Sequence, residues 1–189
     1  TAIDSGKPSI NGSITSPVTI NASGTLGGNG TITGDVTNYG NIAPGNSIGT
    51  LRVNGNYTSG SNSVYQVEVN SAGQSDKIIV SGTATLNGGT VAVSAVSGDY
   101  SKVTQYTILT AGSVVGTYAS VTSNLAFLTP SLVYDPYNVY LTLTRNSTDF
   151  TDPADTPNRI AVAGVIGNVT DITSVLLGMS VDGVRDAYD

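Results

Sequence analysis

The sequence contains no cysteine, no histidine and no tryptophan, and only 11% of its 189 residues are charged. The missing cysteines exclude a disulfide framework and thiolate chemistry, which suits a protein exported across cell envelopes without cross-links. Without histidine, nucleophiles and general bases are restricted to carboxylates, Lys, Tyr or Ser, none of which has an evident partner. No catalytic residue is therefore assigned, and we expect a chain that is not an enzyme.

Basic residues are also scarce, because seven Lys and Arg are scattered singly and the formal net charge is −6. Nucleic acid is not an expected partner, since phosphate binding requires a basic patch. No run approaches the ~18 consecutive apolar residues of a membrane-spanning helix, and Thr1–Ile10 lacks the basic and then apolar pattern of a signal sequence. These features predict an interior segment of a longer protein.

Glycine is abundant, with 23 residues, and it punctuates a sequence rich in Ser, Thr, Asn and β-branched side chains. From Ile14 to about Val96, β-type runs of about four to seven residues alternate with Gly/Asn turns, and none has a helical period. The punctuating pairs are Asn11-Gly12, Asn29-Gly30, Asn54-Gly55 and Asn87-Gly88, whose residues tolerate positive φ. The segment is therefore expected to be all-β.

Two architectures compete for this segment. Asn-Gly pairs favour the hairpins of an antiparallel sandwich, whereas the recurrence of Gly-Thr before an apolar residue favours a solenoid of repeated rungs. The recurrence is seen at Gly24, Gly30, Gly49, Gly82 and Gly89. Stacked rungs at ~4.8 Å would complete both the hydrogen bonds and the core, and outer ladders of Thr, Ser and Asn would explain the low charge.

The pattern changes between Ser75 and Asn146, where the β-type runs are longer and the aromatic residues gather. Val139–Thr144 alternates cleanly between apolar residues and Tyr or Thr. Two prolines and acidic residues in Thr151–Pro157 then predict a linker. Thr156 before Pro157 has the form of a helix N-cap, and short helices are expected behind it, although their glycines weaken them. Their apolar stripes would be Ile160, Ala163 and Ile166 or Val162, Val165 and Val169, followed by Ile172, Val175, Leu176 and Met179.

The ordered set of these motifs resembles the passenger domains of pertactin-like bacterial autotransporters, the type V secreted proteins. The residues that carry the resemblance are Gly24–Gly34, Gly40–Leu51, Ser75–Gly82, Thr107–Thr110, Gly116–Tyr118 and Asn138–Leu143. The resemblance implies a right-handed parallel β-helix with a short C-terminal helical linker. It implies passenger rungs over 1–74, an autochaperone-like C-terminal β region over 75–150, and a linker with short helices over 151–189. That linker would lead to the protein's own outer-membrane β-barrel, which this sequence lacks.

Two stretches of the sequence match known ligand-binding motifs only incompletely. Gly27–Asp35 is similar to the calcium-binding nonapeptide, but Ile32 occupies the place of the carboxylate, so no metal ligand is assigned. The glycines of the same stretch miss the dinucleotide fingerprint by one residue, so no cofactor is expected. The acidic residues before the linker are interpreted as solvated turn residues, and they are Asp4, Asp35, Glu68, Asp76, Asp99, Asp135 and Asp149. The tyrosines are interpreted as packing across rungs on a β surface with their hydroxyls in water.

The leading hypothesis for function is a structural and folding role in a Gram-negative bacterium, at the cell surface or secreted through the outer membrane. The aromatic C-terminal rungs would fold first and template the upstream rungs, with a folding nucleus at Tyr106, Ile108, Leu109, Tyr134, Tyr140 and Leu141. Two alternatives stay open. One is an adhesin or self-association surface that binds other passenger copies or a host surface, and the other is a carbohydrate-active β-helix, which would need paired carboxylates in a cleft.

Overall fold

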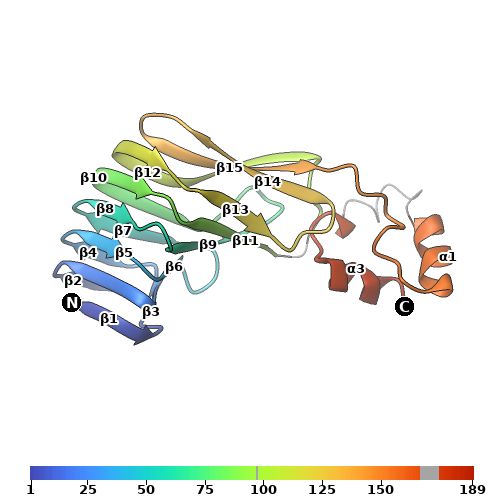
Figure 1. The fold of residues 1–189 in the computed structure, drawn as a ribbon, viewed down its shortest axis with the longest axis horizontal. Coiled ribbons are helices and arrows are strands. Elements are labelled where there is room, and N and C mark those ends of the chain that lie inside the picture. The colour runs from blue at the N-terminus through green and yellow to red at the C-terminus, as the bar shows by residue number, and fades with distance from the viewer. Residues whose placement is uncertain (97, 167–174) are drawn as a thin grey trace.

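A computed structural model describes residues 1–96, 98–166 and 175–189, and it contains a stack of strands with a helical tail at one side (Figure 1). Fifteen strands belong to one hydrogen-bonded arrangement that is not closed into a barrel. Each turn of the chain contributes three short strands, which pair in parallel with the strands of the next turn. The predicted parallel β-helix is therefore confirmed, and the sandwich alternative is wrong for these rungs.

The stack has three faces. The first face holds β2 (Ser13–Thr15), β4 (Thr31–Thr33), β7 (Thr50–Asn54) and the first halves of β10 (Lys77–Asn87) and β12 (Val103–Thr117). The second holds β1 (Ala2–Gly6), the first half of β3 (Val18–Gly28), β5 (Val36–Asn38), β8 (Tyr57–Ser59) and the second halves of β10 and β12. The third holds the second half of β3, β6 (Asn41–Pro44), β9 (Val64–Val69), β11 (Thr90–Ala95) and β13 (Ser120–Ser123).

The rungs lengthen steadily toward the C-terminal end. On the first face Ile14 pairs with Ile32, and Ile32 pairs with Val53. The next pairs are Leu51 with Ile78 and Ile78 with Leu109, so the separation in sequence between partners grows at every step. Figure 1 shows the same widening from the blue rungs to the yellow ones. The wider rungs enclose more side chains, which is why the large buried aromatic residues concentrate in them.

At two of the four Asn-Gly pairs, glycine allows close stacking of the rungs. Among the described residues only glycines have positive φ, and of the four Asn-Gly glycines only Gly88 does, with φ of 95°. A Cβ on Gly30 would lie 2.1 Å from the carbonyl oxygen of Gly12, one rung below. Gly30 and Gly55 therefore mark places where successive rungs approach too closely for a side chain, whereas Gly12 has open space around it and Gly88 has the positive φ of a turn.

The C-terminal end of the stack is closed by an antiparallel hairpin that the sequence pattern does not predict. Strand β15 (Asn138–Arg145) runs antiparallel to β12, and β14 (Leu128–Tyr134) runs antiparallel to β15. Pro130 lies in the outermost strand β14, and proline is typical of an edge strand, because it has no N–H to donate to a further strand. The hairpin therefore ends the stack with a proline at its edge.

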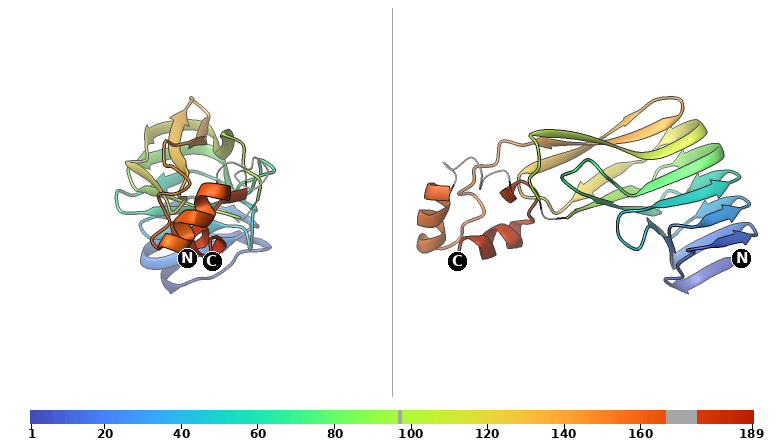
Figure 2. Two further views of the ribbon diagram at one scale, coloured as in Figure 1. Left: turned by 90° about the vertical axis from the view of Figure 1, so that its right-hand side faces the viewer. Right: turned by 180° about the vertical axis from the view of Figure 1, so that it is seen from behind.

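The tail contains α1 (Pro157–Ile166) and α3 (Val181–Ala187), which lie beyond the strand ends in the right-hand view of Figure 2. The Arg159 N–H donates to the Thr156 side-chain oxygen over 3.3 Å, which confirms the expected N-cap. Neither predicted stripe is intact, because Ile160 and Val165 are exposed while Ala163 is buried. Val169 and Ile172 lie outside the described residues. No helix in the described part is long and apolar enough to cross a bilayer.

Short contacts connect the tail to the stack. The Ala126 N–H donates to the Met179 carbonyl, and Leu125 forms an isolated antiparallel bridge with Ser180. Gly178 packs so closely on the Tyr100 ring that a Cβ there would lie 2.5 Å from it. The boundaries predicted at residues 74 and 150 stay predictions. Strand β10 follows residue 74 and pairs with β7 and β8, which precede it, so the stack continues across this position.

Candidate functional site

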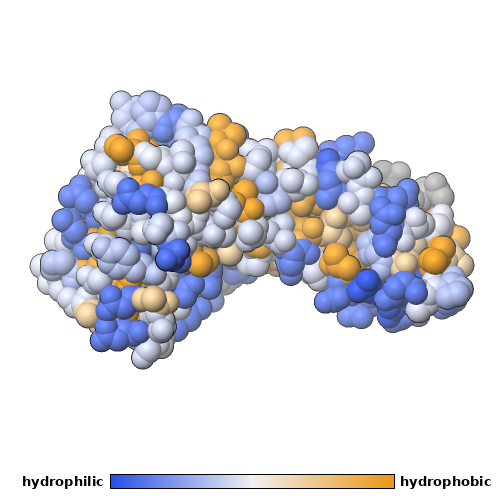
Figure 3. All heavy atoms as spheres, viewed as in Figure 1, coloured by the Kyte–Doolittle hydropathy of each residue, from blue (hydrophilic) through white to orange (hydrophobic). Residues whose placement is uncertain are grey.

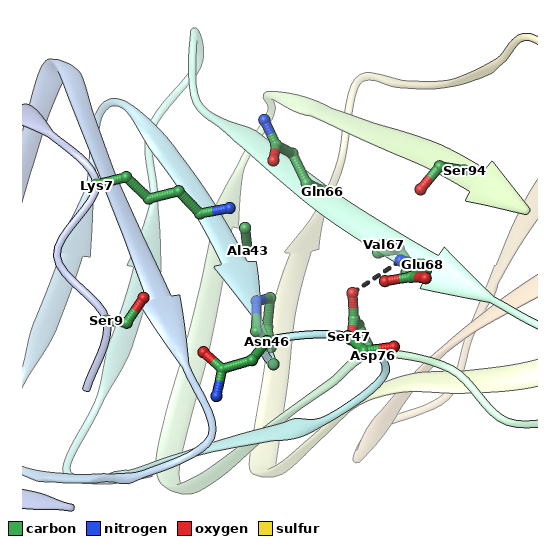
Figure 4. Close-up of a pocket in the computed structure, with 12 residues that line it drawn as sticks. Lys7, Ser9, Ala43, Asn46, Ser47, Gln66, Val67, Glu68, Asp76 and Ser94 are labelled. Carbon is green, nitrogen blue, oxygen red and sulfur yellow. Dashed lines mark hydrogen bonds between the residues drawn. The ribbon is translucent and has the colours of Figure 1, made fainter. Parts of the chain in front are cut away.

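A polar groove of about 400 Å³ lies on the third face, between the loop that follows β6 and the outer surface of β9. Figure 4 shows Gln66 and Glu68 on β9, Ser94 on β11, and the Lys7 side chain extending toward Ala43. In β9 the side chains alternate, so Gln66 and Glu68 face outward while Tyr65 and Val67 face the core. The period of two of a β-strand therefore supplies the polar wall of this groove.

Asp76 lies at the end of the groove and is 4% exposed. Its Oδ1 accepts the Gly49 N–H over 2.9 Å and its Oδ2 accepts the Glu68 N–H over 2.8 Å. Burial raises the pKa of this carboxyl from 3.8 to about 6, although the two N–H donors act in the opposite direction. The expectation that this aspartate is solvated is wrong, because the turn over 70–75 brings its side chain back under the loop of 45–49.

The groove thus brings together two carboxylates, those of Glu68 and Asp76, as a carbohydrate-active enzyme would require. Asp76 is buried and already accepts two backbone N–H groups, so it cannot reach a substrate as general acid or nucleophile. Its role is to hold the loop of 45–49 against β9. The described residues contain no group of three or more His, Cys, Asp or Glu side chains able to hold a metal ion. The groove therefore offers polar side chains on a fixed wall, and its geometry gives no support to catalysis.

The residues of the predicted folding nucleus lie in the cap, which comprises β12, β14 and β15. Leu141 is buried and pairs with Tyr106 on one side and with Leu132 on the other. Ile108 and Leu109 are fully buried beneath them. These four nucleus residues, Tyr106, Ile108, Leu109 and Leu141, belong to one contiguous apolar cluster.

The two remaining nucleus residues lie nearer the surface. Tyr134 is half-buried, and its hydroxyl accepts the Tyr118 N–H over 3.1 Å. Tyr140 is on the outer side of the hairpin, where its hydroxyl donates to Asp135 over 2.8 Å. Tyr134 therefore joins the hairpin to the last rung, whereas Tyr140 stabilises the hairpin itself.

Tyr65, a buried tyrosine that is absent from the predicted nucleus, forms a hydrogen bond with a bulge in β12. The pairing of β12 with β15 shifts register between Thr107 and Leu109, which leaves Ile108 as the extra residue. The Tyr65 hydroxyl donates to the Ile108 carbonyl over 2.6 Å in the core. Tyr65 comes from β9, so this bond ties the cap to a rung 43 residues earlier in the chain.

The prediction that the tyrosines lie at the surface is wrong for most of those in the wide rungs. The buried tyrosines of the stack are Tyr57, Tyr65, Tyr100, Tyr106 and Tyr118. The sequence signal that could have placed Tyr65 inside is its alternation with Gln66 and Glu68 in β9, which puts it on the same face as Val67 and Val69. Tyr39 and Tyr137 are exposed as expected.

The turn between β14 and β15 is organised by Asp135. One of its oxygens accepts the N–H groups of Tyr137 and Asn138, each over 2.7 Å, and both oxygens accept from the Asn138 amide. These donors, led by the Tyr137 N–H, lower the pKa of Asp135 to about 2. The turn residues therefore fix the register of the hairpin by local contacts.

No protein-family model matches this chain. Over 178 residues the chain is 36% identical to an extracellular serine protease of Serratia marcescens, a match that covers 88% of this chain and 17% of that protein. The chain therefore spans less than a fifth of the length of this curated relative. Because it contains no histidine, a Ser–His–Asp triad cannot be assembled from this chain alone.

Proposed function

We propose that this chain is the C-terminal part of the β-helical passenger of a secreted autotransporter, and that its cap folds first and templates the rungs below it. Templated stacking would promote translocation of the passenger through the outer membrane and its display at the cell surface. The chain's similarity to an extracellular protein supports export. The observation that carries the folding role is the antiparallel hairpin that closes the stack over buried nucleus residues.

The hairpin is suited to early folding because its contacts are local. Only residues 135–137 separate β14 from β15, whereas every parallel pair of the stack requires closure of a whole rung, as between Thr25 and Asn41. Loop closure costs entropy before contacts form, so local pairs form sooner. The Asp135 network stabilises the turn at the same time.

A two-stranded hairpin alone is only marginally stable in water, so it needs a third strand and an apolar face. Strand β12 supplies both, because it pairs with β15 and carries Tyr106, Ile108 and Leu109 into the core. Strand β10 then pairs along almost the whole of its length with β12, from Ile78 to Asn87. In a solenoid each completed rung offers a full edge to the next, so propagation from the cap is favourable.

Two matched leucine variants test the order of folding. Leu141 in the cap and Leu26 in an early rung are both fully buried, so replacing either by Ala should lower the free energy of unfolding by about 2–5 kcal/mol. If the cap is the nucleus, Leu141→Ala also slows refolding on the order of tenfold, whereas Leu26→Ala mainly speeds unfolding. Stopped-flow refolding by tyrosine fluorescence measures both rates. Equal refolding rates for the two variants, or slower refolding only for Leu26→Ala, would contradict the proposal.

Limited proteolysis in increasing urea gives an independent test. We expect a resistant fragment that starts between Asn56 and Ser75 and retains the β14–β15 hairpin, because the wide rungs and cap hold the large buried aromatics. Mass spectrometry of the fragment fixes its ends. Resistance confined to residues before Gly55 would refute the folding role.

A self-association surface is a second candidate, supported by exposed apolar side chains at the cap. Val115 and Tyr137 are 54% and 58% exposed, and the Val114 N–H donates to the Pro136 carbonyl, which brings their segments together. On the face shown in Figure 3 hydrophobic residues form small separate patches. Sedimentation velocity over a range of concentrations separates the two roles, since a strict monomer excludes self-association. The protein's own outer-membrane barrel and a host surface remain proposed partners.

A further inference from the structure

The proposed folding role does not involve the polar groove on the third face. Its floor includes Ala43, whose side chain is only a methyl group, and Ala43 pairs with Gly27 on the neighbouring strand. A Cβ on Gly27 would lie 3.4 Å from the Lys7 Cε, so this lysine covers Gly27 beside the floor. The small side chain of Ala43 leaves a depression here, whereas Thr25 and Asn41 fill the neighbouring position on the same face.

Polar side chains around this floor are free to bind. In the described part of the chain, the side chains of Lys7, Gln66, Glu68 and Ser94 form no hydrogen bond or ion pair with the protein, although all of them line the groove. They supply donors from an ammonium, an amide and a hydroxyl, and acceptors from a carboxylate, an amide and a hydroxyl. Figure 4 shows Lys7 coming from one side of the floor and Gln66, Glu68 and Ser94 from the other.

One wall of the groove is held in place by the core. Asp76 accepts the N–H groups of Gly49 and Glu68, so the loop of 45–49 is fixed relative to β9. A ligand therefore meets a preformed site, for which little further ordering of the protein is required.

We propose that this groove binds a short uncharged saccharide. Sugar hydroxyls both donate and accept, which matches a mixture of donors and acceptors on rigid strands better than a ligand of one polarity would. Two carboxylates repel anionic polymers, and the lining has no aromatic or large exposed aliphatic side chain to hold an apolar ligand. Because Asp76 is tied to the backbone, the saccharide is bound without being hydrolysed.

The affinity should be low. Saccharide sites gain much of their strength from an aromatic ring beneath the sugar, and no aromatic side chain lines this groove. Dissociation constants in the millimolar range are therefore expected.

Amide chemical shifts of the whole 189-residue chain test the proposal, with cellobiose, lactose and N,N′-diacetylchitobiose as uncharged probes. We expect shifts confined to 43–47, 66–68 and 94 for at least one disaccharide, without cleavage of that sugar. Gln66→Ala should weaken binding about tenfold, because it removes a side chain that offers both a donor and an acceptor. The matched control is Gln105→Ala, which alters an exposed glutamine of β12 outside the groove and should leave the affinity unchanged.

Several outcomes would overturn the proposal. These are the absence of shifts for all three disaccharides, shifts that Gln66→Ala leaves unaltered, and shifts caused by triglycine in place of the sugars. Spectra of both variants without sugar report on their folding, since an intact fold changes only amides near the substitution. Release of monosaccharides would refute binding without hydrolysis.

Discussion

Replacing Asp76 by Asn changes the one carboxyl that is buried against the core of the described stack. Asp76 is 4% exposed and ties the loop of 45–49 to β9 through the N–H groups of Gly49 and Glu68. The asparagine has the same shape, but its amide nitrogen cannot accept a hydrogen bond. One of the two N–H groups is therefore left without its acceptor.

The pKa of Asp76 determines how the effect depends on pH. Its value of about 6 in the folded protein lies above the ordinary 3.8, so the folded state binds the proton more tightly than the unfolded state. The stabilisation from this proton is fully present below pH 3.8 and is lost as the pH rises through 6. Since one pKa unit corresponds to about 1.4 kcal/mol, the whole change is worth about 3 kcal/mol. At pH 7, where the natural carboxylate accepts both N–H groups, the lost acceptor in Asp76→Asn costs ~1–3 kcal/mol.

Urea unfolding followed by far-ultraviolet circular dichroism, at pH 4.5 and pH 7, measures the difference. The free energy of unfolding of the natural protein relative to Asp76→Asn should be larger at pH 4.5 than at pH 7 by about 2 kcal/mol. Asp135→Asn is the control, because the pKa of Asp135 is lowered to about 2. Its carboxylate stabilises the fold above pH 3.8 and loses that effect as the pH falls toward 2. An Asp76→Asn protein with the same pH dependence as the natural one would refute the reasoning.

Two further predictions concern single contacts in the stack. Tyr65→Phe removes the hydroxyl that donates to the Ile108 carbonyl, so the buried bulge loses its partner and the free energy of unfolding should fall by ~1–3 kcal/mol. Tyr39→Phe, at an exposed tyrosine, should change it by less than about 0.5 kcal/mol, and equal effects in urea unfolding would contradict the role of the bulge. Gly30→Ala should lower the thermal midpoint, because its Cβ would lie 2.1 Å from a backbone oxygen. Gly12→Ala has open space around it, and a similar loss there would show that the rungs do not meet at Gly30.

The local pattern of the sequence predicts much of the fold. Recurring Gly-Thr units and short β-type runs indicate a stack, and the structure pairs those runs in parallel. The Thr156-Pro157 pair predicts the start of α1, which the structure places there. These features depend on neighbouring residues only, which is why they can be recognised without knowing the fold.

The residues of the candidate sites are harder to predict from the local sequence pattern. Asp76 is one of several acidic residues beside turns, and nothing local distinguishes it from solvated ones such as Asp135. It is buried because the chain folds back over 70–75, which brings it under the loop of 45–49. Tyr65 likewise finds its partner on Ile108 only when a rung 43 residues later closes over it.

Composition, strand period and turn residues are local properties, and from the sequence they establish an all-β chain of short strands and exclude histidine-dependent chemistry. The tertiary structure alone decided how wide each rung is, where the stack ends in an antiparallel hairpin, and which polar side chains meet in the groove. The physical reason is that rung width and side-chain partners depend on contacts between different rungs, such as Thr25 with Asn41 or Tyr65 with Ile108, which no local pattern encodes.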